Sequence, residues 1–254
     1  MMAVLNRHAD IGALDALIYA YKHEPRETRL AETAIVLDSS VFLRLGSYVD
    51  VVDYLHTAHL APLILPGQSV QEFWNNDLSV SDPIAAAIKK RFDALEAEIG
   101  KLDATFSDFS DRFLALLAEF RTSFGYIYDG ATIRRTYSLF EVLRTKAIIT
   151  FVSRERFAPM AENRKKTKTP PGFLDSKDGG FFIWLDMLEG LIVAQDRNIP
   201  FTQVALVTTD KKTDWSRGGI AHPILCAEVR ALIGVPFETW DIGKLMREVA
   251  AFSG

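Results

Sequence analysis

Six acidic residues stand where an α/β fold would bring them together, because they follow apolar runs or lie near the starts of helices: Asp38, Glu72, Asp175, Asp178, Asp186 and Asp210. Carboxylates that converge without matching lysine or arginine side chains repel one another, and a divalent cation relieves that repulsion. Mg²⁺ and Mn²⁺ prefer oxygen ligands and assist phosphodiester cleavage by activating water and stabilising the leaving oxygen. The pattern therefore predicts a metal site for phosphodiester hydrolysis.

Each of these residues also has a structural interpretation. An aspartate directly after a strand often caps the next helix, and Asp178 stands at such a capping position. Glu72 alone would be a solvated residue on a helix face, and Asp186 is as readily an ordinary exposed position as a ligand. The metal interpretation gains weight only because several such residues fall on one predicted edge.

That edge is predicted from short apolar runs that end at polar residues. Residues 34–37 end at Asp38, and residues 204–207 end at Thr208-Thr209-Asp210. Continuous apolar runs are typical of parallel strands that are buried on both faces of a sheet. Further strands are expected at 61–65 and 235–240. Ligands of open α/β sheets bind outside the carboxyl ends of the strands, so we expect Asp38 and Asp210 on the same edge.

Most of the remaining chain has apolar residues at helical spacing, which predicts helices. Helices are expected over 41–56, after Pro66-Gly67, over 130–152, 178–195 and 226–233, and after Asp241. An amphipathic N-terminal helix is expected within 1–32. The segment 84–125 predicts two antiparallel helices with a break at Gly100. This helical insertion is either a lid over the substrate groove or the surface of a homodimer, and light scattering would distinguish the two.

Composition limits the class of protein. The 254 residues are 48% hydrophobic and 24% charged with a net charge of −4, which excludes a disordered chain, a collagen-like repeat and a globally basic nucleic-acid binder. No run approaches the roughly 18 apolar residues of a membrane span. The single cysteine, Cys226, cannot form an internal disulfide, so we expect a cytoplasmic protein. We expect one domain over residues 1–254.

One local stretch is strongly basic. Residues 154–168 contain six basic and two acidic side chains, a net charge of +4. A nuclease must hold a polyanion beside an acidic metal site, and a flanking basic stretch supplies that attraction. The alternative is a solvated loop. Lys165 and Lys166 are the candidates for substrate binding within it.

The ordered motifs of the chain resemble PIN-domain nucleases. Residues 35–40 (IVLDSS) resemble the first motif of that family, and residues 65–73 (LPGQSVQEF) resemble the second, which supplies a helical glutamate. The stretches 170–175, 182–184 and 207–215 resemble a PIN-like subgroup typical of bacterial proteins. The resemblance covers roughly residues 33–80 and 140–245, with the helices of 84–125 as an insertion.

The resemblance implies a three-layer fold with a central, mostly parallel sheet flanked by helices. It also implies a nuclease that depends on Mg²⁺ or Mn²⁺ and acts most often on RNA. Carried over by position, Asp38, Glu72 and Asp210 would be metal ligands, and Thr208 would orient water or a carboxylate. The expected substrate contacts near the metal are Ser39, Ser40, Thr208 and Lys211, the last preferred over Lys212.

One position departs from the subgroup. Its members commonly carry a Gly-Asp pair before the apolar stretch with tryptophan, whereas this chain has Gly179-Gly180. Either Asp175 or Asp178 then supplies the missing carboxylate and acts as a catalytic metal ligand. Otherwise the chain is a weakened PIN-like module that binds nucleic acid or a protein without cleaving it.

Other chemistries have weaker support. His56 and His59 could share a helical face, but no third soft ligand stands nearby for zinc. Cys226 has no histidine partner in a recognisable motif. A phosphohydrolase with Asp38 as nucleophile is disfavoured, because Ser40 stands where a second aspartate is needed.

Overall fold

A five-stranded parallel sheet forms the centre of the computed structural model, which describes residues 1–6, 11–22, 29–76, 83–99, 101, 108–124 and 130–253. The strand order is β3-β2-β1-β4-β7, and every neighbouring pair is parallel. The strands are β1 (Thr33–Leu37), β2 (Leu63–Pro66), β3 (Ile148–Thr150), β4 (Gln203–Val207) and β7 (Phe237–Trp240). The predicted α/β class is therefore confirmed.

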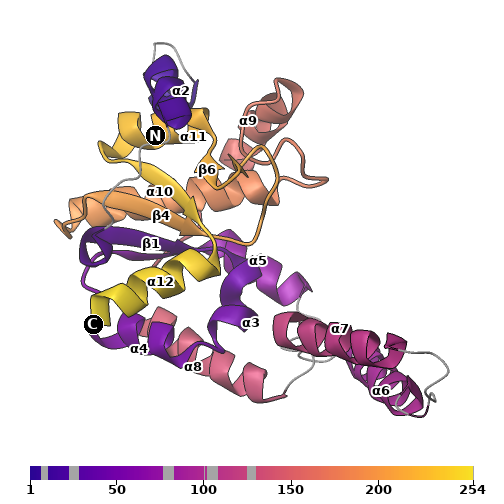
Figure 1. Ribbon diagram of the computed structural model, residues 1–254. Helices are drawn as coiled ribbons and strands as arrows, with labels where there is room; N and C mark the ends of the chain where they lie inside the picture. The colour runs from indigo at the N-terminus through magenta and orange to yellow at the C-terminus, as the bar shows by residue number, and fades with distance from the viewer. Residues whose placement is uncertain are drawn as a thin grey trace.

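Helices cover both faces of this sheet and make three layers (Figure 1). In β1, Ala34 and Val36 pack into one hydrophobic cluster while Ile35 and Leu37 pack into the other. The first cluster includes side chains of α9 (Arg154–Lys166), α10 (Gly179–Asp196) and α11 (Pro223–Ile233). The second includes side chains of α3 (Phe42–Leu45), α4 (Val49–Thr57), α8 (Gly130–Lys146) and α12 (Ile242–Ser253). Burial on both faces explains why these strands are apolar without alternation.

The strand order reverses between β1 and β4. The chain adds β2 and β3 on one side of β1 and then crosses to β4 and β7 on the other side. Ligands of such sheets bind at this crossing point, outside the carboxyl ends of the strands. Asp38 follows β1 there, and its backbone N–H donates to the carbonyl of Val207 in β4 at 3.1 Å. The predicted edge is therefore where the topology favours a site.

Several predicted elements are confirmed. The insertion consists of α6 (Pro83–Ile99) and α7 (Phe109–Phe124), which pack on one another and extend from the α/β body (Figure 1). Gly100, the predicted break between them, lies outside the described residues. The side chain of Asp241 accepts a hydrogen bond from the backbone of Lys244 at 2.6 Å, as expected of a cap for α12.

Two helix predictions were wrong in extent. The helix expected over 41–56 is split into α3 and α4, because the chain approaches α8 closely at Gly46, where a Cβ atom would lie 2.8 Å from the Cα of Thr136. The helix expected over 130–152 ends at Lys146, and the β-branched residues that follow form β3 beside β2.

The N-terminal segment differs from prediction, and the basic stretch is not the solvated loop that was its alternative interpretation. Residues 154–166 form helix α9 and not a loop, with the side chain of Ser153 accepting from the backbone of Arg156. The N-terminal segment forms α1 (Met2–Asn6) and α2 (Ala13–Lys22), and Gly12 precedes α2 with φ +74°. Residues 7–10 and 23–28 lie outside the described part.

Smaller elements complete the fold. The helix after β2 is α5 (Gly67–Asn76), and short 3₁₀ turns cover Leu30–Glu32 and Ser39–Val41. A hairpin of β5 (Ser216–Arg217) and β6 (Ile220–Ala221) turns through Gly218 and Gly219, both at positive φ. Within the described part of the chain, no helix has both the length and the apolar character needed to span a membrane.

Candidate functional site

A cleft with a volume of about 1120 Å³ opens at the carboxyl edge of the sheet. Four carboxylate residues from four separate segments line it: Asp38 after β1, Glu72 on α5, Asp175 before α10, and Asp210 after β4. Side chains of Ser39, Ser40, Gln68, Thr208 and Lys212 also line the cleft. The structure therefore brings together four of the five acidic residues that the sequence predicted as catalytic.

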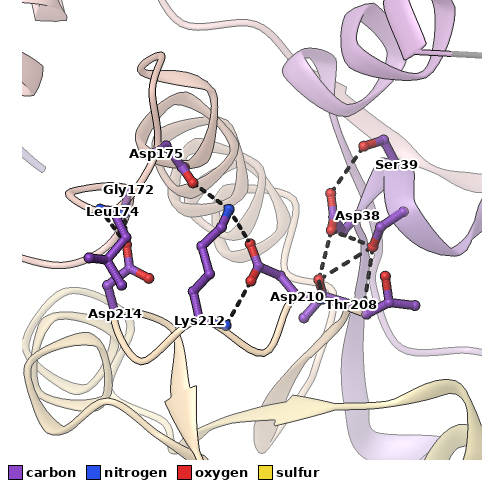
Figure 2. Close-up of polar contacts among 11 residues, drawn as sticks. Asp38, Ser39, Gly172, Leu174, Asp175, Thr208, Asp210, Lys212 and Asp214 are labelled. Carbon is purple, nitrogen blue, oxygen red and sulfur yellow. Dashed lines mark hydrogen bonds and ion pairs between the residues drawn. The ribbon is translucent and has the colours of Figure 1, made fainter.

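Hydroxyl groups hold the side chain of Asp38, which is only 8% exposed. Ser40 Oγ and Thr208 Oγ1 both donate to Asp38 Oδ2 at 2.7 Å, and Ser39 Oγ donates to Oδ1 at 3.3 Å (Figure 2). Thr208 Oγ1 also accepts from the backbone N–H of Asp210 at 3.0 Å. The hydroxyl groups that were expected to contact substrate thus orient the carboxylate of Asp38, and Thr208 also links it to the backbone of Asp210.

Glu72 is positioned by a chain of polar contacts. Gln68 Nε2 donates to Glu72 Oε1 at 3.0 Å, and Gln68 Oε1 accepts from Arg154 at 3.1 Å. Burial raises the pKa of Glu72, and the nearby carboxylates of Asp38 and Asp175 raise it further. Burial is thus the main cause of the raised pKa, the neighbouring negative charges add to it, and a bound cation would lower it.

Asp186 holds Gln68 and Arg154, which belong to the same chain of contacts. Its fully buried carboxylate accepts from the backbone N–H groups of Gln68 and Val152, each at 2.8 Å, and forms an ion pair with Arg154 at 2.9 Å. Of the two interpretations left open for Asp186, the structure favours the structural one, although the position is buried and not exposed.

Asp175 occupies the space that Gly180 leaves open. A Cβ atom built on Gly180 would lie 2.5 Å from Asp175 Oδ2, and one built on Gly179 would collide with the carboxylate of Glu72. Two carboxylates therefore lie against the first turn of α10, where the helix dipole favours negative charge. Of the two candidates for the missing carboxylate, the structure places Asp175 in the cleft.

The loop that carries Asp175 is held by Asp214. The Asp214 side chain is fully buried, and its Oδ2 accepts from the backbone N–H groups of Gly172 at 2.9 Å and Leu174 at 3.2 Å (Figure 2). Gly172 adopts φ +85°, a conformation that favours glycine. Asp214 therefore fixes the backbone immediately before Asp175.

Lys212 lies between two of the cleft carboxylates. Its Nζ is 2.5 Å from Asp175 Oδ1 and 3.1 Å from Asp210 Oδ2, and its backbone N–H donates to Asp210 Oδ1 at 2.8 Å (Figure 2). The contact with Asp175 is the main cause that raises the pKa of Lys212 above its ordinary range. The side chain that reaches the cleft is thus Lys212 and not the preferred Lys211.

The remaining predicted residues do not line the cleft. Asp178 forms an ion pair with Lys165 at 3.4 Å, and its side chain does not form the expected helix cap. Lys166 pairs with Glu162 at 2.7 Å. Asp178 is therefore neutralised by a lysine beside the cleft, and both candidate substrate-binding lysines of the basic stretch are already engaged.

The basic stretch as a whole is more structural than its charge suggested. Arg164, only 4% exposed, forms a buried ion pair with Glu228 at 2.9 Å, and the same glutamate accepts from the indole of Trp184. Arg154 is held by Asp186. With the pairs of Lys165 and Lys166, four of the six basic residues thus have a carboxylate partner.

The donor set suits a hard divalent ion, but two features of its arrangement oppose binding. Carboxylate and hydroxyl oxygens are the ligands that Mg²⁺ and Mn²⁺ prefer. Across the described residues, however, no three or more histidine, cysteine or acidic side chains are placed to hold one ion together. Lys212 stands between two of the four candidates, so an ion that used all four would have to displace its ammonium group.

No family model, curated protein or solved structure matches the chain. The geometry of the cleft, together with the motif resemblance, therefore carries the functional argument.

The sequence analysis ranked Lys212 below Lys211 and missed two further contributors, Asp214 and Gln68. Lys212 lies two positions after Asp210, and residues two apart in an extended segment share a side, which was a usable signal. Asp214 and Gln68 act through hydrogen bonds to backbone or amide groups of other segments. No local pattern indicates such contacts.

Proposed function

We propose that this protein hydrolyses phosphodiester bonds with the help of Mg²⁺ or Mn²⁺, and that its substrate is RNA. The observation that supports this most strongly is the convergence of Asp38, Glu72, Asp175 and Asp210 from four distant segments onto one cleft at the crossing point of a parallel sheet. Such a concentration of carboxylates is costly without a cation. The location is also where sheets of this topology bind ligands.

The four carboxylates would hold the ion, which when bound would supply charge neutralisation and an activated water. Ser40 and Thr208 keep the Asp38 carboxylate in one orientation. Gln68 does the same for Glu72, so the side chains of Asp38 and Glu72 are oriented before an ion arrives.

The size of the cleft is compatible with an extended substrate. Pockets for small molecules typically enclose roughly 300–1,000 Å³, and this cleft, at about 1120 Å³, lies close to the upper end of that range. Lys177 adds positive charge to its lining, and the four carboxylates keep the lining acidic until a cation is bound. The choice of RNA rests on the motif resemblance.

Cleavage of end-labelled RNA and single-stranded DNA in the presence of Mn²⁺ tests the proposal. We expect the wild-type chain to cut RNA, and Asp38→Asn and Asp210→Asn each to abolish cutting. Asp53→Asn, an exposed acidic position on α4, is the matched control and should cut like the wild type. Cleavage that survives both cleft substitutions would contradict the assignment.

A second candidate function is binding without catalysis. The position of Lys212 between Asp175 and Asp210 favours it, because the lysine already neutralises part of the site. This candidate predicts that millimolar Mn²⁺ leaves the thermal unfolding of the protein unchanged, since an ion that does not bind the native state cannot stabilise it. It also predicts RNA binding without Mn²⁺, measured by fluorescence anisotropy.

A further inference from the structure

Lys212 is the cleft side chain whose role the proposed function does not explain. It extends from the loop after β4 and reaches two carboxylates that come from different segments. Its side chain is 46% exposed, while those of Asp175 and Asp210 are 15% and 24% exposed. A half-exposed cation thus lies on two acceptors that are themselves mostly enclosed.

The contacts of Lys212 join residues that would otherwise repel. Asp175 and Asp210 both approach the same ammonium group, so their charges lie close to one another. The ammonium supplies the positive charge that this part of the cleft needs when no ion is bound. It also ties the loop before α10 to the loop after β4.

The same contacts can be exchanged for others, because the ammonium end of Lys212 is accessible to water. Exposed ion pairs contribute little net stability, and a half-exposed lysine can rotate into water more readily than a buried one. Divalent ions carry twice the charge and bind several carboxylates at once. Competition between the ammonium and such an ion would therefore favour the ion at sufficient concentration.

We propose that Lys212 is a placeholder cation, which holds Asp175 and Asp210 in the ion-free protein and leaves them when a divalent ion binds. The inference rests on the proposed function. The displaced ammonium group stays tethered at the cleft, where a substrate phosphate would be its next partner. Lys211 carries the same charge one residue earlier but is not part of the cleft lining, so it does not share this role.

Binding of Mn²⁺ alone to the full chain, followed by the electron paramagnetic resonance signal of the free ion, tests the inference. Loss of two partly exposed ion pairs should let Lys212→Met bind Mn²⁺ about fivefold more tightly than the wild type. Lys211→Met removes the same charge from the same loop and should stay within about twofold of the wild type. Equal or weaker binding by Lys212→Met would overturn the inference.

A second variant tests the inference independently, in case the first does not fold. Lys212→Arg keeps the charge and offers the carboxylates a forked donor, so it should bind Mn²⁺ more weakly than the wild type. Circular dichroism and thermal unfolding establish that each variant is folded. Tighter binding by Lys212→Arg would contradict competition for the carboxylates.

The outcomes separate this inference from the proposed function. If the wild type binds Mn²⁺, Asp38→Asn loses that binding and Lys212→Met is unchanged, the metal site stands and the placeholder role fails. If neither the wild type nor Lys212→Met binds Mn²⁺, the proposed function fails and the inference fails with it.

Discussion

The carboxylate of Asp175 lies over the backbone of Gly180, so closely that a Cβ atom there would be 2.5 Å from Asp175 Oδ2. The subgroup that the motifs resemble has an acidic residue at the position of Gly180, and this chain has glycine. The two observations fit together, because the missing side chain makes room for a carboxylate from a neighbouring loop. The glycine at the position where the resemblance predicts an acidic residue is thus accompanied by the carboxylate of Asp175 in the same place.

Gly180→Ala should separate folding from function. The nearest atom to the new methyl group is the end of the Asp175 side chain, which can rotate away, so the fold should persist. Alanine is also the better helix former, by up to about 1 kcal/mol. Displacing one ligand by an ångström or so should reduce Mn²⁺-dependent RNA cleavage by roughly 10- to 100-fold. Thermal unfolding and the cleavage assay measure the two effects.

The control for Gly180→Ala is a double variant that moves the acidic group from position 175 to position 180. Asp175→Gly combined with Gly180→Asp returns the acidic group to the position that the resemblance predicts. This double variant should recover part of the activity that Gly180→Ala loses. Full activity of Gly180→Ala itself would show that the position of Asp175 is unimportant.

Glu72→Gln should stabilise the ion-free protein at neutral pH. The raised pKa of Glu72 means that the folded state favours the protonated carboxyl, so the free energy of unfolding gains from this group at low pH and loses that gain as pH rises through its folded pKa. A neutral amide removes this loss while it can still accept from Gln68. Urea unfolding at several pH values should show a weaker pH dependence for the variant, whose Mn²⁺ binding should also be weaker. An unchanged pH dependence would contradict the account.

Asp214→Ala tests how the Asp175 loop is held. The change leaves the backbone N–H groups of Gly172 and Leu174 without their acceptor, at about 1–3 kcal/mol for the buried N–H of Gly172 and less for the partly exposed N–H of Leu174. Unfolding in urea should show a loss of this order, together with weaker Mn²⁺ binding. Asp214→Asn keeps an acceptor oxygen and should retain most of both. Weaker Mn²⁺ binding by Asp214→Asn, at wild-type stability, would instead point to a direct role of the charge.

The strands that carry the site could be predicted from the sequence because each combines an apolar run with a polar end. β1 and β4 are continuous hydrophobic runs that stop at Asp38 and at Thr208, and both boundaries were recovered within a residue. β3 was missed because it has only three residues and continues a helical pattern from α8. A short edge strand forms because it pairs with a neighbouring strand, here β2, and the local pattern of residues 148–150 does not reveal that pairing.

The cleft was predictable to the extent that strand ends position its residues. Asp38 and Asp210 follow from topology alone. Asp175 and Asp178 were equivalent in the sequence, since both precede α10, and only the packing of the loop on Gly180 distinguishes them. The partners of the basic stretch were unpredictable for a similar reason: Glu228 and Asp186 lie far from Arg164 and Arg154 along the chain.

A crystal of the protein soaked in Mn²⁺ tests the central claim most directly, because anomalous scattering locates the ion without reference to activity. The account predicts an anomalous peak in the cleft, with oxygen atoms of Asp38, Glu72, Asp175 and Asp210 around it and the ammonium group of Lys212 withdrawn from Asp175. Mn²⁺ bound only elsewhere, with Lys212 still between the two carboxylates, would contradict it.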